Sequence, residues 1–133
     1  FTERAGRLVT QYSGYKVLDG RAVNGQLTLG ENIGDLSGLV VAYKAYRISL
    51  GGTQPPVIDG FTGPQRFFLG WAQIWRLKYR DDELRVRLLT DVHSPSEFRV
   101  NGVVANMAEF HDAFGLVAGD RLYRAPGDRV KIW

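Results

Sequence analysis

The amino-acid sequence predicts a mainly α-helical fold, because it contains several helix-start patterns and few strand signals. Four segments place a capping residue three positions before an acid or an amide, which is the spacing of a capping box or its near relative. These segments are Thr28–Glu31, Thr62–Gln65, Ser94–Glu97 and Asn106–Glu109. Strand signals are confined to short pieces such as Val17–Leu18 and Val130–Trp133. We expect residues 1–133 to form a single domain.

The capping signals and the apolar spacing place six helices in chain order. We expect helices over Phe1–Ser13, Gly30–Ser49, Pro64–Tyr79, Asp82–Leu89, Pro95–Val100 or a little beyond, and Met107–Phe114. The first helix is indicated by apolar Leu8 and Val9 near Tyr12. Pro64 and Pro95 stand at first helical positions, where a missing N–H does no harm. The glycines and prolines that precede Pro64 cannot occupy a helix interior, so we expect a loop there.

The composition excludes several classes of protein. The chain has 17 basic and 14 acidic residues and no Cys, so it has neither a disulfide framework nor a thiolate metal site. No apolar run approaches the roughly 20 residues that a membrane-spanning helix needs. The densest basic stretch, Arg76–Arg87, is interrupted by Asp81–Glu83, which is typical of a solvated face and not of a phosphate-binding stripe. We therefore expect no nucleic-acid partner and no membrane span.

The helix that begins near Glu31 carries two acids on one face. At about 100° per residue, Glu31 and Asp35 lie one above the other, and the same stripe continues with Gly38, Ala42 and Ala45. Two carboxylates in this arrangement repel, so we expect a cation beside them. Apolar side chains cover much of the remaining surface, which predicts a helix buried nearly all round. The alternative is that Glu31 closes a capping box and Asp35 is a first-turn acid favoured by the helix dipole.

Four stretches of the sequence, taken in order, resemble one known family. They are Val23–Asp35, Phe67–Trp75, Thr90–Arg99 and the ending Val130–Trp133. Together they are similar to the neprilysin-like zinc endopeptidases, the family of neprilysin and the endothelin-converting enzymes. The resemblance implies the C-terminal helical part of a thermolysin-like zinc peptidase catalytic lobe. It also implies zinc as the cofactor, a peptide as the substrate, and cleavage on the amino side of hydrophobic residues.

The resemblance implies roles for five polar residues. Glu31 corresponds to a zinc ligand, and Asp35 to an acid that accepts a hydrogen bond from a zinc-bound His. His93 corresponds to the histidine that donates to the oxyanion of the tetrahedral intermediate, with Asp91 as its orienting partner. Arg99 corresponds to the arginine that holds a substrate backbone carbonyl. Without the motif around them, His93 would be a structural histidine and Arg99 a solvated helix charge.

Two further observations complete the set of candidate residues. Ile74 and Trp75 match the family's pair that lines the pocket for the side chain after the scissile bond. An aromatic core stripe that includes Phe68 and Trp71 explains this segment equally well, so both interpretations stay open. His111 lies outside the matched motifs, and we expect it to be a surface helical histidine without a role.

The H-E-x-x-H helix of the family has no counterpart in this sequence. Its two His bind zinc and its Glu is the general base, whereas the only histidines here are His93 and His111. We therefore expect an excerpt that begins after that helix, that has the remainder of the same polypeptide as its partner, and that is inactive alone. Two alternatives are a non-catalytic interaction domain that retained the peptidase fold, and a small basic binding module. The absence of Cys favours a bacterial-type member, whether periplasmic, secreted or cytoplasmic.

Overall fold

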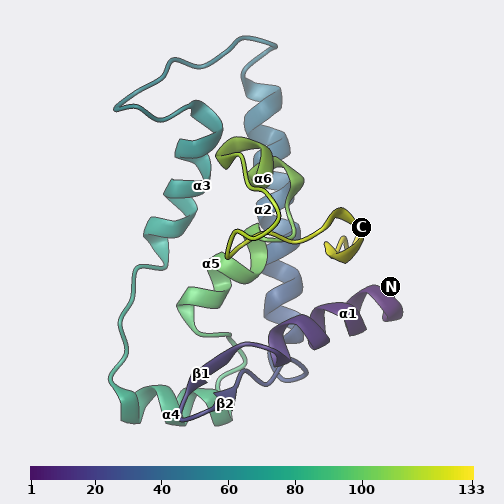
Figure 1. Cartoon of the computed structure of the whole chain (residues 1–133), viewed down its shortest axis with the longest axis vertical. Coiled ribbons are helices and arrows are strands. Elements are labelled where there is room, and N and C mark those ends of the chain that lie inside the picture. Colours follow the sequence, from purple (N-terminus) through teal and green to yellow (C-terminus); the bar gives the residue numbers. More distant parts are fainter.

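The computed structural model describes all residues from 1 to 133 and contains six α-helices and one two-stranded hairpin (Figure 1). The elements are α1 (Thr2–Ser13), β1 (Lys16–Leu18), β2 (Arg21–Ala22), α2 (Leu29–Ser49), α3 (Gly63–Ile74), α4 (Asp81–Thr90), α5 (Ser96–Val104), α6 (Ala108–Phe114) and the 3-10 turn Pro126–Asp128. The prediction of a mainly helical fold is confirmed. None of the helices is both long and apolar enough to cross a membrane.

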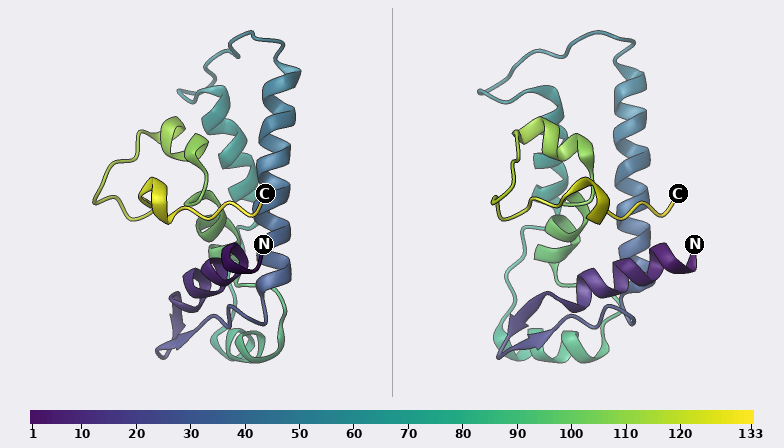
Figure 2. Two further views of the ribbon diagram at one scale, coloured as in Figure 1. Left: turned by 90° about the vertical axis from the view of Figure 1, so that its right-hand side faces the viewer. Right: turned by 45° about the vertical axis from the view of Figure 1, so that its right-hand side comes forward.

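Helix α2 is the longest element of the molecule, and the other elements are arranged along it (Figure 2). Helix α5 packs against α2 and α1, while α6 packs against α3. The antiparallel hairpin β1–β2 and helix α4 lie together at the lower end, beside the start of α2. The loop between α2 and α3 turns over the upper end (Figure 1). The start of α2 lies at the opposite end of the molecule from this loop.

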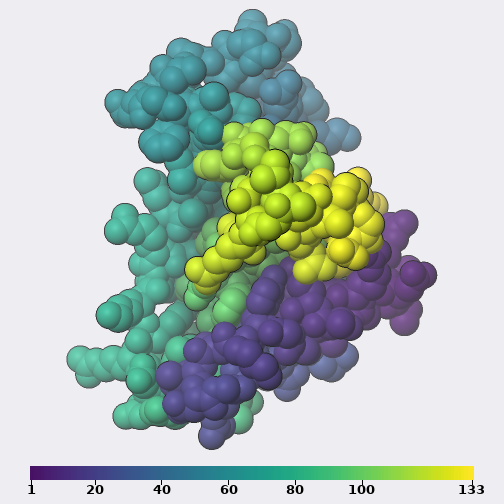
Figure 3. Space-filling model, viewed as in Figure 1, coloured from purple at the N-terminus to yellow at the C-terminus, as the bar shows by residue number.

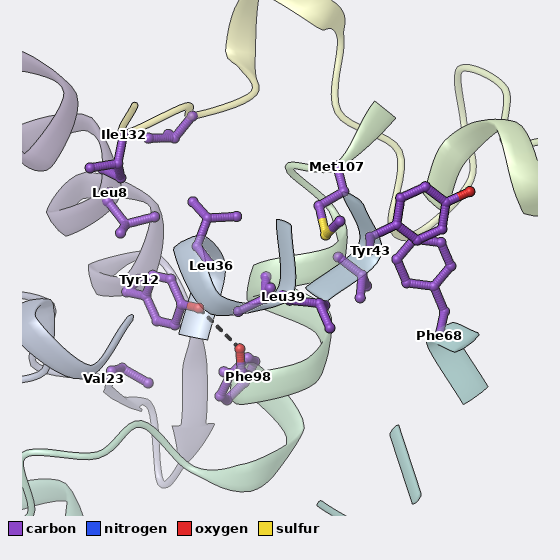
Figure 4. Close-up of a cluster of buried hydrophobic side chains, with 13 residues drawn as sticks. Leu8, Tyr12, Val23, Leu36, Leu39, Tyr43, Phe68, Phe98, Met107 and Ile132 are labelled. Atoms are coloured by element: carbon purple, nitrogen blue, oxygen red, sulfur yellow. Dashed lines mark hydrogen bonds between the residues drawn. The ribbon is translucent and has the colours of Figure 1, made fainter. Parts of the chain in front are cut away.

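The core lies between α1, α2, α5 and the C-terminal tail (Figure 4). Tyr12 is fully buried, and its hydroxyl donates a hydrogen bond of 3.2 Å to the carbonyl of Phe98. A Cβ at Gly102 would lie 2.6 Å from the Tyr12 hydroxyl oxygen, so α5 can approach α1 this closely only with glycine there. Farther along α2, Tyr43 stacks on Phe68 of α3 with ring centroids 5.2 Å apart.

Four of the six helices begin and end within about two residues of the predicted bounds, and α5 continues a little beyond Val100, as predicted. Helix α3 is shorter than predicted. It ends at Ile74 and does not reach Tyr79, so this part of the prediction is wrong. Residues 75–80 instead form the linker from α3 to α4 (Figure 1). An extended chain covers about 3.3 Å per residue and a helix only about 1.5 Å. The extended linker therefore reaches the lower end of the molecule, where the Tyr79 hydroxyl bonds Ser96.

The predicted strand Val130–Trp133 is not a strand, although its side chains do alternate between buried and exposed. Val130 and Ile132 are buried, whereas Lys131 and Trp133 are exposed. The backbone N–H of Val130 donates to the Asn106 side chain at 2.8 Å, and the Ile132 carbonyl accepts from Arg4 at 3.1 Å. This tail lies beside α1 (Figure 3). The ring of Trp133 stacks on that of Phe1. Side chains thus take the hydrogen bonds that a neighbouring strand would have made.

Only one of the four predicted capping boxes forms. The Thr62 hydroxyl accepts from the Gln65 backbone, and the Gln65 side chain accepts from the Thr62 backbone. Helices α2, α5 and α6 do begin near Thr28, Ser94 and Asn106, but these side chains make no capping bond. All three are buried and bond to other buried or local groups instead. The helix starts are confirmed, and the mechanism predicted for three of them is wrong.

Helix α2 is buried on one side only, which corrects the prediction of burial nearly all round. Its buried side chains are Asn32, Leu36, Leu39 and Tyr43. The opposite face, which includes Gly38, Val41 and Ala42, is exposed because no other element of this chain packs against it.

His111 is buried, so the prediction of a surface histidine is also wrong. It is 3% exposed. Its Nε2 lies 2.9 Å from the Ala105 carbonyl and its Nδ1 lies 3.2 Å from Nη2 of Arg129. The tautomer with hydrogen on Nε2 satisfies both contacts, because the carbonyl accepts and the guanidinium donates. His111 therefore joins α6 to the end of α5 and to the C-terminal tail.

Candidate active site

Three segments of the chain converge at the lower end of α2. They are the first turns of α2, the connection between α4 and α5, and the first turns of α5. The convergence brings together five of the seven candidate residues: Glu31, Asp35, Asp91, His93 and Arg99. Asp35 and Arg99 are 64 positions apart in the sequence and still make direct contact.

His93 lies between two carboxylates. Its Nδ1 is 2.8 Å from Oδ1 of Asp91, and its Nε2 is 3.2 Å from Oε2 of Glu31. The Nδ1 contact is a hydrogen bond to Asp91, whereas Nε2 and Glu31 lie within ion-pair distance without a hydrogen bond between them. The side chains of His93 and Glu31 are 43% and 44% exposed, whereas that of Asp91 is 20% exposed. The imidazole is thus held by Asp91, the less exposed of its two neighbours, and it remains accessible to a ligand.

Asp91 is the most constrained acid of the site. Its Oδ1 accepts from the backbone N–H of His93 at 2.9 Å as well as from the ring, and its Oδ2 accepts from Arg87 at 2.7 Å. These contacts favour the carboxylate, and the backbone hydrogen bond from His93 is the main cause that lowers the pKa of Asp91. Arg87 also bonds Glu83 and stacks over the Tyr79 ring, 5.0 Å from its centroid.

Arg99 and Asp35 form a two-bond ion pair. Nε and Nη2 of Arg99 donate to the two oxygens of Asp35, each at 2.7 Å. The side chains are 14% and 10% exposed, and the guanidinium carbon lies 3.9 Å from the Trp75 ring centroid. The hydrogen bonds to Asp35 raise the pKa of Arg99 above its usual value. Nη1 of Arg99 makes no hydrogen bond within the chain, which leaves a donor for a further acceptor.

The structure supplies a cation for Asp35 and places a histidine beside Glu31. Arg99 pairs with Asp35, and His93 lies beside Glu31. The requirement for positive charge followed from the spacing of the acids, but the identity of the partners did not. Asp35 uses both of its oxygens on Arg99, so in this structure it acts as the anchor of the arginine.

A cavity of about 180 Å³ opens beside these residues. It is lined by Trp75, Leu77, Tyr79, Arg87, Asp91, His93, Ser94, Pro95, Ser96 and Arg99. Ile74 is absent from the lining and is 66% exposed, so of the predicted pocket pair only Trp75 borders this cavity. Sequence reasoning missed Leu77, Tyr79 and Arg87, because it placed the first two inside a longer α3 and the third in a solvated charge run. No signal in the sequence marked the early end of α3.

A larger hollow of about 600 Å³ lies elsewhere, between α2 and α6. Lys44 and Arg47 line one side of it, and Glu109 and Asp112 line the other. It contains no histidine and none of the candidate residues. We assign the site to the smaller cavity, because its lining includes the candidate residues Asp91, His93 and Arg99, which interact with other acids of the site.

The residues present fit one ligand of a zinc site. The Glu31 carboxylate makes no hydrogen bond and lies within ion-pair distance of His93 through Oε2 only, so its other oxygen is free for a metal ion. Asp35 has no free oxygen, and the chain contains no group of three or more His, Cys, Asp or Glu side chains that could hold a metal ion. A zinc ion at Glu31 therefore needs further ligands from outside residues 1–133.

Comparisons with known proteins place the whole chain in one family. The model of Peptidase family M13 matches residues 1–130. Endothelin-converting enzyme 1 of Mus musculus is 40% identical over 136 residues, and Neprilysin-3 of Drosophila melanogaster is 37% identical over 137 residues. Each alignment covers 100% of this chain and 17% of the relative.

A solved structure extends the similarity to the fold. The zinc metalloprotease Zmp1 of Mycobacterium tuberculosis, crystallised with an inhibitor, is 48% identical and matches with a TM-score of 0.96 over 99% of this chain and 21% of that chain. The present chain thus spans about a fifth or less of the length of these relatives and corresponds to their C-terminal region. Since the family match extends over nearly the whole sequence and the helices have the same arrangement, the chain belongs to peptidase family M13, the zinc metallopeptidases of the neprilysin and endothelin-converting enzyme type.

Proposed function

We propose that the complete protein is a zinc-dependent endopeptidase that hydrolyses peptide bonds on the amino side of hydrophobic residues. The single observation that carries the proposal is that His93 and Arg99 line one cavity and are each paired with an acid of α2, Glu31 and Asp35. These residues come from separate segments, and each offers a group suited to peptide hydrolysis. Family membership supports the reaction type.

In this proposal His93 stabilises charge that develops on the scissile carbonyl oxygen. Its Nε2, which lies 3.2 Å from Oε2 of Glu31 without a hydrogen bond to it, is the donor for that oxyanion. Asp91 holds the ring by its contact with Nδ1 at 2.8 Å, so the imidazole keeps its orientation while Nε2 donates to the oxyanion. A donor fixed in advance does not need to reorganise during the reaction.

Arg99 positions the peptide backbone. Asp35 and the Trp75 ring fix its guanidinium plane, while Nη1 is free to donate to a substrate carbonyl. Trp75 and Leu77 contribute apolar walls to the adjacent cavity, which suits a hydrophobic substrate side chain. We keep Ile74 in the proposal only as a wall completed by residues outside this chain, because it is 66% exposed here.

Zinc, when bound, would supply the activated water and would polarise the scissile carbonyl. Glu31 is the residue of this chain that would hold it, with the remaining ligands and the general base provided by the rest of the polypeptide. The role proposed for Asp35 toward a zinc-bound His would require that His to share an oxygen already bonded to Arg99.

The exposed face of α2 supports the rest of the same polypeptide as partner. The chain exposes 8072 Å², although a folded monomer of 14.9 kDa exposes only about 7,000 Å². Val41 and Ile48 on α2 are 66% and 70% exposed. The small residues Gly38 and Ala42 beside them would allow another helix to approach closely.

Peptide hydrolysis by the complete enzyme tests the function. We expect cleavage of peptides with a hydrophobic residue after the scissile bond, loss of activity on chelation and recovery on zinc addition. Arg99→Ala should raise KM about tenfold or more, because it removes a charged hydrogen bond to the substrate. The isolated chain should bind zinc only weakly in equilibrium dialysis and cleave nothing. Absence of any cleavage by the zinc-loaded complete enzyme would favour the non-catalytic interaction domain.

A further inference from the structure

We infer that Asn32 and Ser94 are positioning residues, which form a buried bridge that holds His93 in register with Glu31. This inference rests on the function proposed above and names two residues that act through their neighbours. Asn32 directly follows Glu31 in the sequence, and Ser94 directly follows His93. A link between Asn32 and Ser94 therefore sets the distance between Glu31 and His93.

The bridge is a short hydrogen bond inside the protein. The Ser94 hydroxyl donates to Oδ1 of Asn32 at 2.7 Å. Asn32 is 1% exposed and Ser94 is 3% exposed, whereas the His93 and Glu31 side chains are each more than 40% exposed. Water competes for the outer contact and cannot reach the inner one, so the inner contact is the more persistent of the two.

The acceptor of the bridge is itself fixed from behind. Nδ2 of Asn32 donates to the Thr28 hydroxyl at 2.9 Å, and that hydroxyl donates to the Asn24 carbonyl at 3.0 Å. Thr28 is also buried, at 3% exposure. The amide of Asn32 therefore has one orientation that satisfies both of its bonds, with its oxygen toward Ser94.

No other buried hydrogen bond joins the His93 loop to α2. The remaining hydrogen bonds of the loop connect Asp91 to Arg87 and His93 and the Pro95 carbonyl to the start of α5, and its other contact with α2 is the exposed ion-pair contact of His93 with Glu31. Arg87 is 42% exposed. The loop can thus be anchored on α4 and still shift relative to Glu31, unless Asn32 holds Ser94.

Kinetics of the complete enzyme test the inference through Ser94→Ala, Asn32→Ala and the double variant. We expect each single change to lower kcat about 10- to 100-fold with KM within about twofold, because a displacement of the order of 1 Å at a catalytic donor has effects of this size. The double variant should be no slower than the slower single variant, because both changes cut the same bond. Asn106→Ala is the matched control. It removes another buried amide that makes three hydrogen bonds far from His93, and its kcat should match the unmodified enzyme.

Hydrogen exchange supplies a measurement that does not depend on catalysis. Peptides that cover Asp91–Pro95 should exchange faster in Ser94→Ala than in the unmodified protein, and should not change in Asn106→Ala. If the unmodified enzyme proves inactive, the proposed function fails while this measurement still tests the bridge. Unchanged exchange in Ser94→Ala would overturn the inference. Normal kcat despite faster exchange, multiplicative effects in the double variant, or an equal kcat loss in Asn106→Ala would overturn it as well.

Discussion

The two histidines of this chain are a natural comparison, because both are fixed by hydrogen bonds and only one is available for chemistry. His93 is 43% exposed and its ring nitrogens face carboxylate oxygens of Asp91 and Glu31. His111 is 3% exposed and its ring nitrogens face a backbone carbonyl and a guanidinium. The partners of His111 are satisfied by one neutral tautomer, whereas the ring of His93 has one hydrogen bond, from Nδ1 to Asp91, and Nε2 has none.

The difference shows what separates a catalytic candidate from a structural histidine. His93 lies on a loop and lines a cavity, and its Nε2 makes no hydrogen bond within the chain. His111 lies under α6 and bonds the end of α5, so a change there alters packing and cannot reach a ligand in that cavity. Substitution at the two positions should therefore affect different quantities.

The largest expected effect is that of His93→Ala on the rate of the complete enzyme. We expect kcat to fall about 100- to 1,000-fold, equivalent to about 2.7–4 kcal/mol of transition-state stabilisation, because an oxyanion donor is lost. The melting temperature should change little, since the ring is 43% exposed and Asp91 keeps its bonds from the position-93 backbone and from Arg87. Steady-state kinetics and thermal unfolding on the same preparation separate the two quantities. A loss of stability without loss of kcat would reverse the assignment.

His111→Ala should produce the opposite pattern. We expect unfolding to become easier by about 2–3 kcal/mol, because the change opens a cavity and leaves the Ala105 carbonyl without its partner. The kcat of the complete enzyme should remain within about twofold of the original value. His111→Gln, which can still donate to that carbonyl, is the control and should recover part of the stability. A large drop in kcat at unchanged stability would show that His111 has a catalytic role.

Tyr12 sharpens the comparison by testing a buried titratable group that is only structural. Burial raises the pKa of Tyr12 well above 10.0, so the unfolded chain loses the phenol proton first as the pH rises. The stability that Tyr12 contributes is therefore complete below about pH 10 and is lost as the pH rises toward the folded-state pKa. Tyr12→Phe should cost about 1 kcal/mol at neutral pH by removing the bond to Phe98.

The test compares thermal unfolding of the two proteins at neutral pH and at about pH 11. The difference in stability between the two proteins should become smaller at the higher pH, because only the unmodified protein has a phenol at position 12 that loses its proton. Parallel alkaline losses in both proteins would show that Tyr12 does not contribute to them. The kcat below pH 9 should be the same in both proteins.

The smallest principal effect is a modest loss of kcat on substitution of Arg87, which bonds Asp91, the acid that holds the His93 ring. Arg87→Ala removes one hydrogen bond to Asp91, but that acid keeps its two contacts with His93. We expect kcat to fall by no more than about fivefold, because the ion pair is partly solvated. Arg85→Ala, on the same helix and paired with Asp19 and Asp82, is the control and should leave kcat unchanged. An effect as large as that of His93→Ala would mean that Arg87 contacts the substrate directly.

The sequence by itself determined the helices and the identity of the residues that carry the motif. Helix starts depend on neighbours within one turn, so the positions of α2, α5 and α6 follow from local patterns even where the capping bond does not form. Likewise, the spacing of Glu31 and Asp35 was enough to require a cation. Their roles in catalysis stay predictions.

Only the tertiary structure decided which partner each polar side chain has. Arg99 reaches Asp35 across 64 positions of sequence, and Asn106 bonds Gln11 across 95. The same holds for the early end of α3, for the tail held by side chains, and for the burial of His111. A hydroxyl, amide or imidazole bonds whatever the fold brings within about 3 Å, and that depends on the packing of distant segments. Local patterns therefore predict where helices form, whereas long-range packing determines which of their polar groups meet.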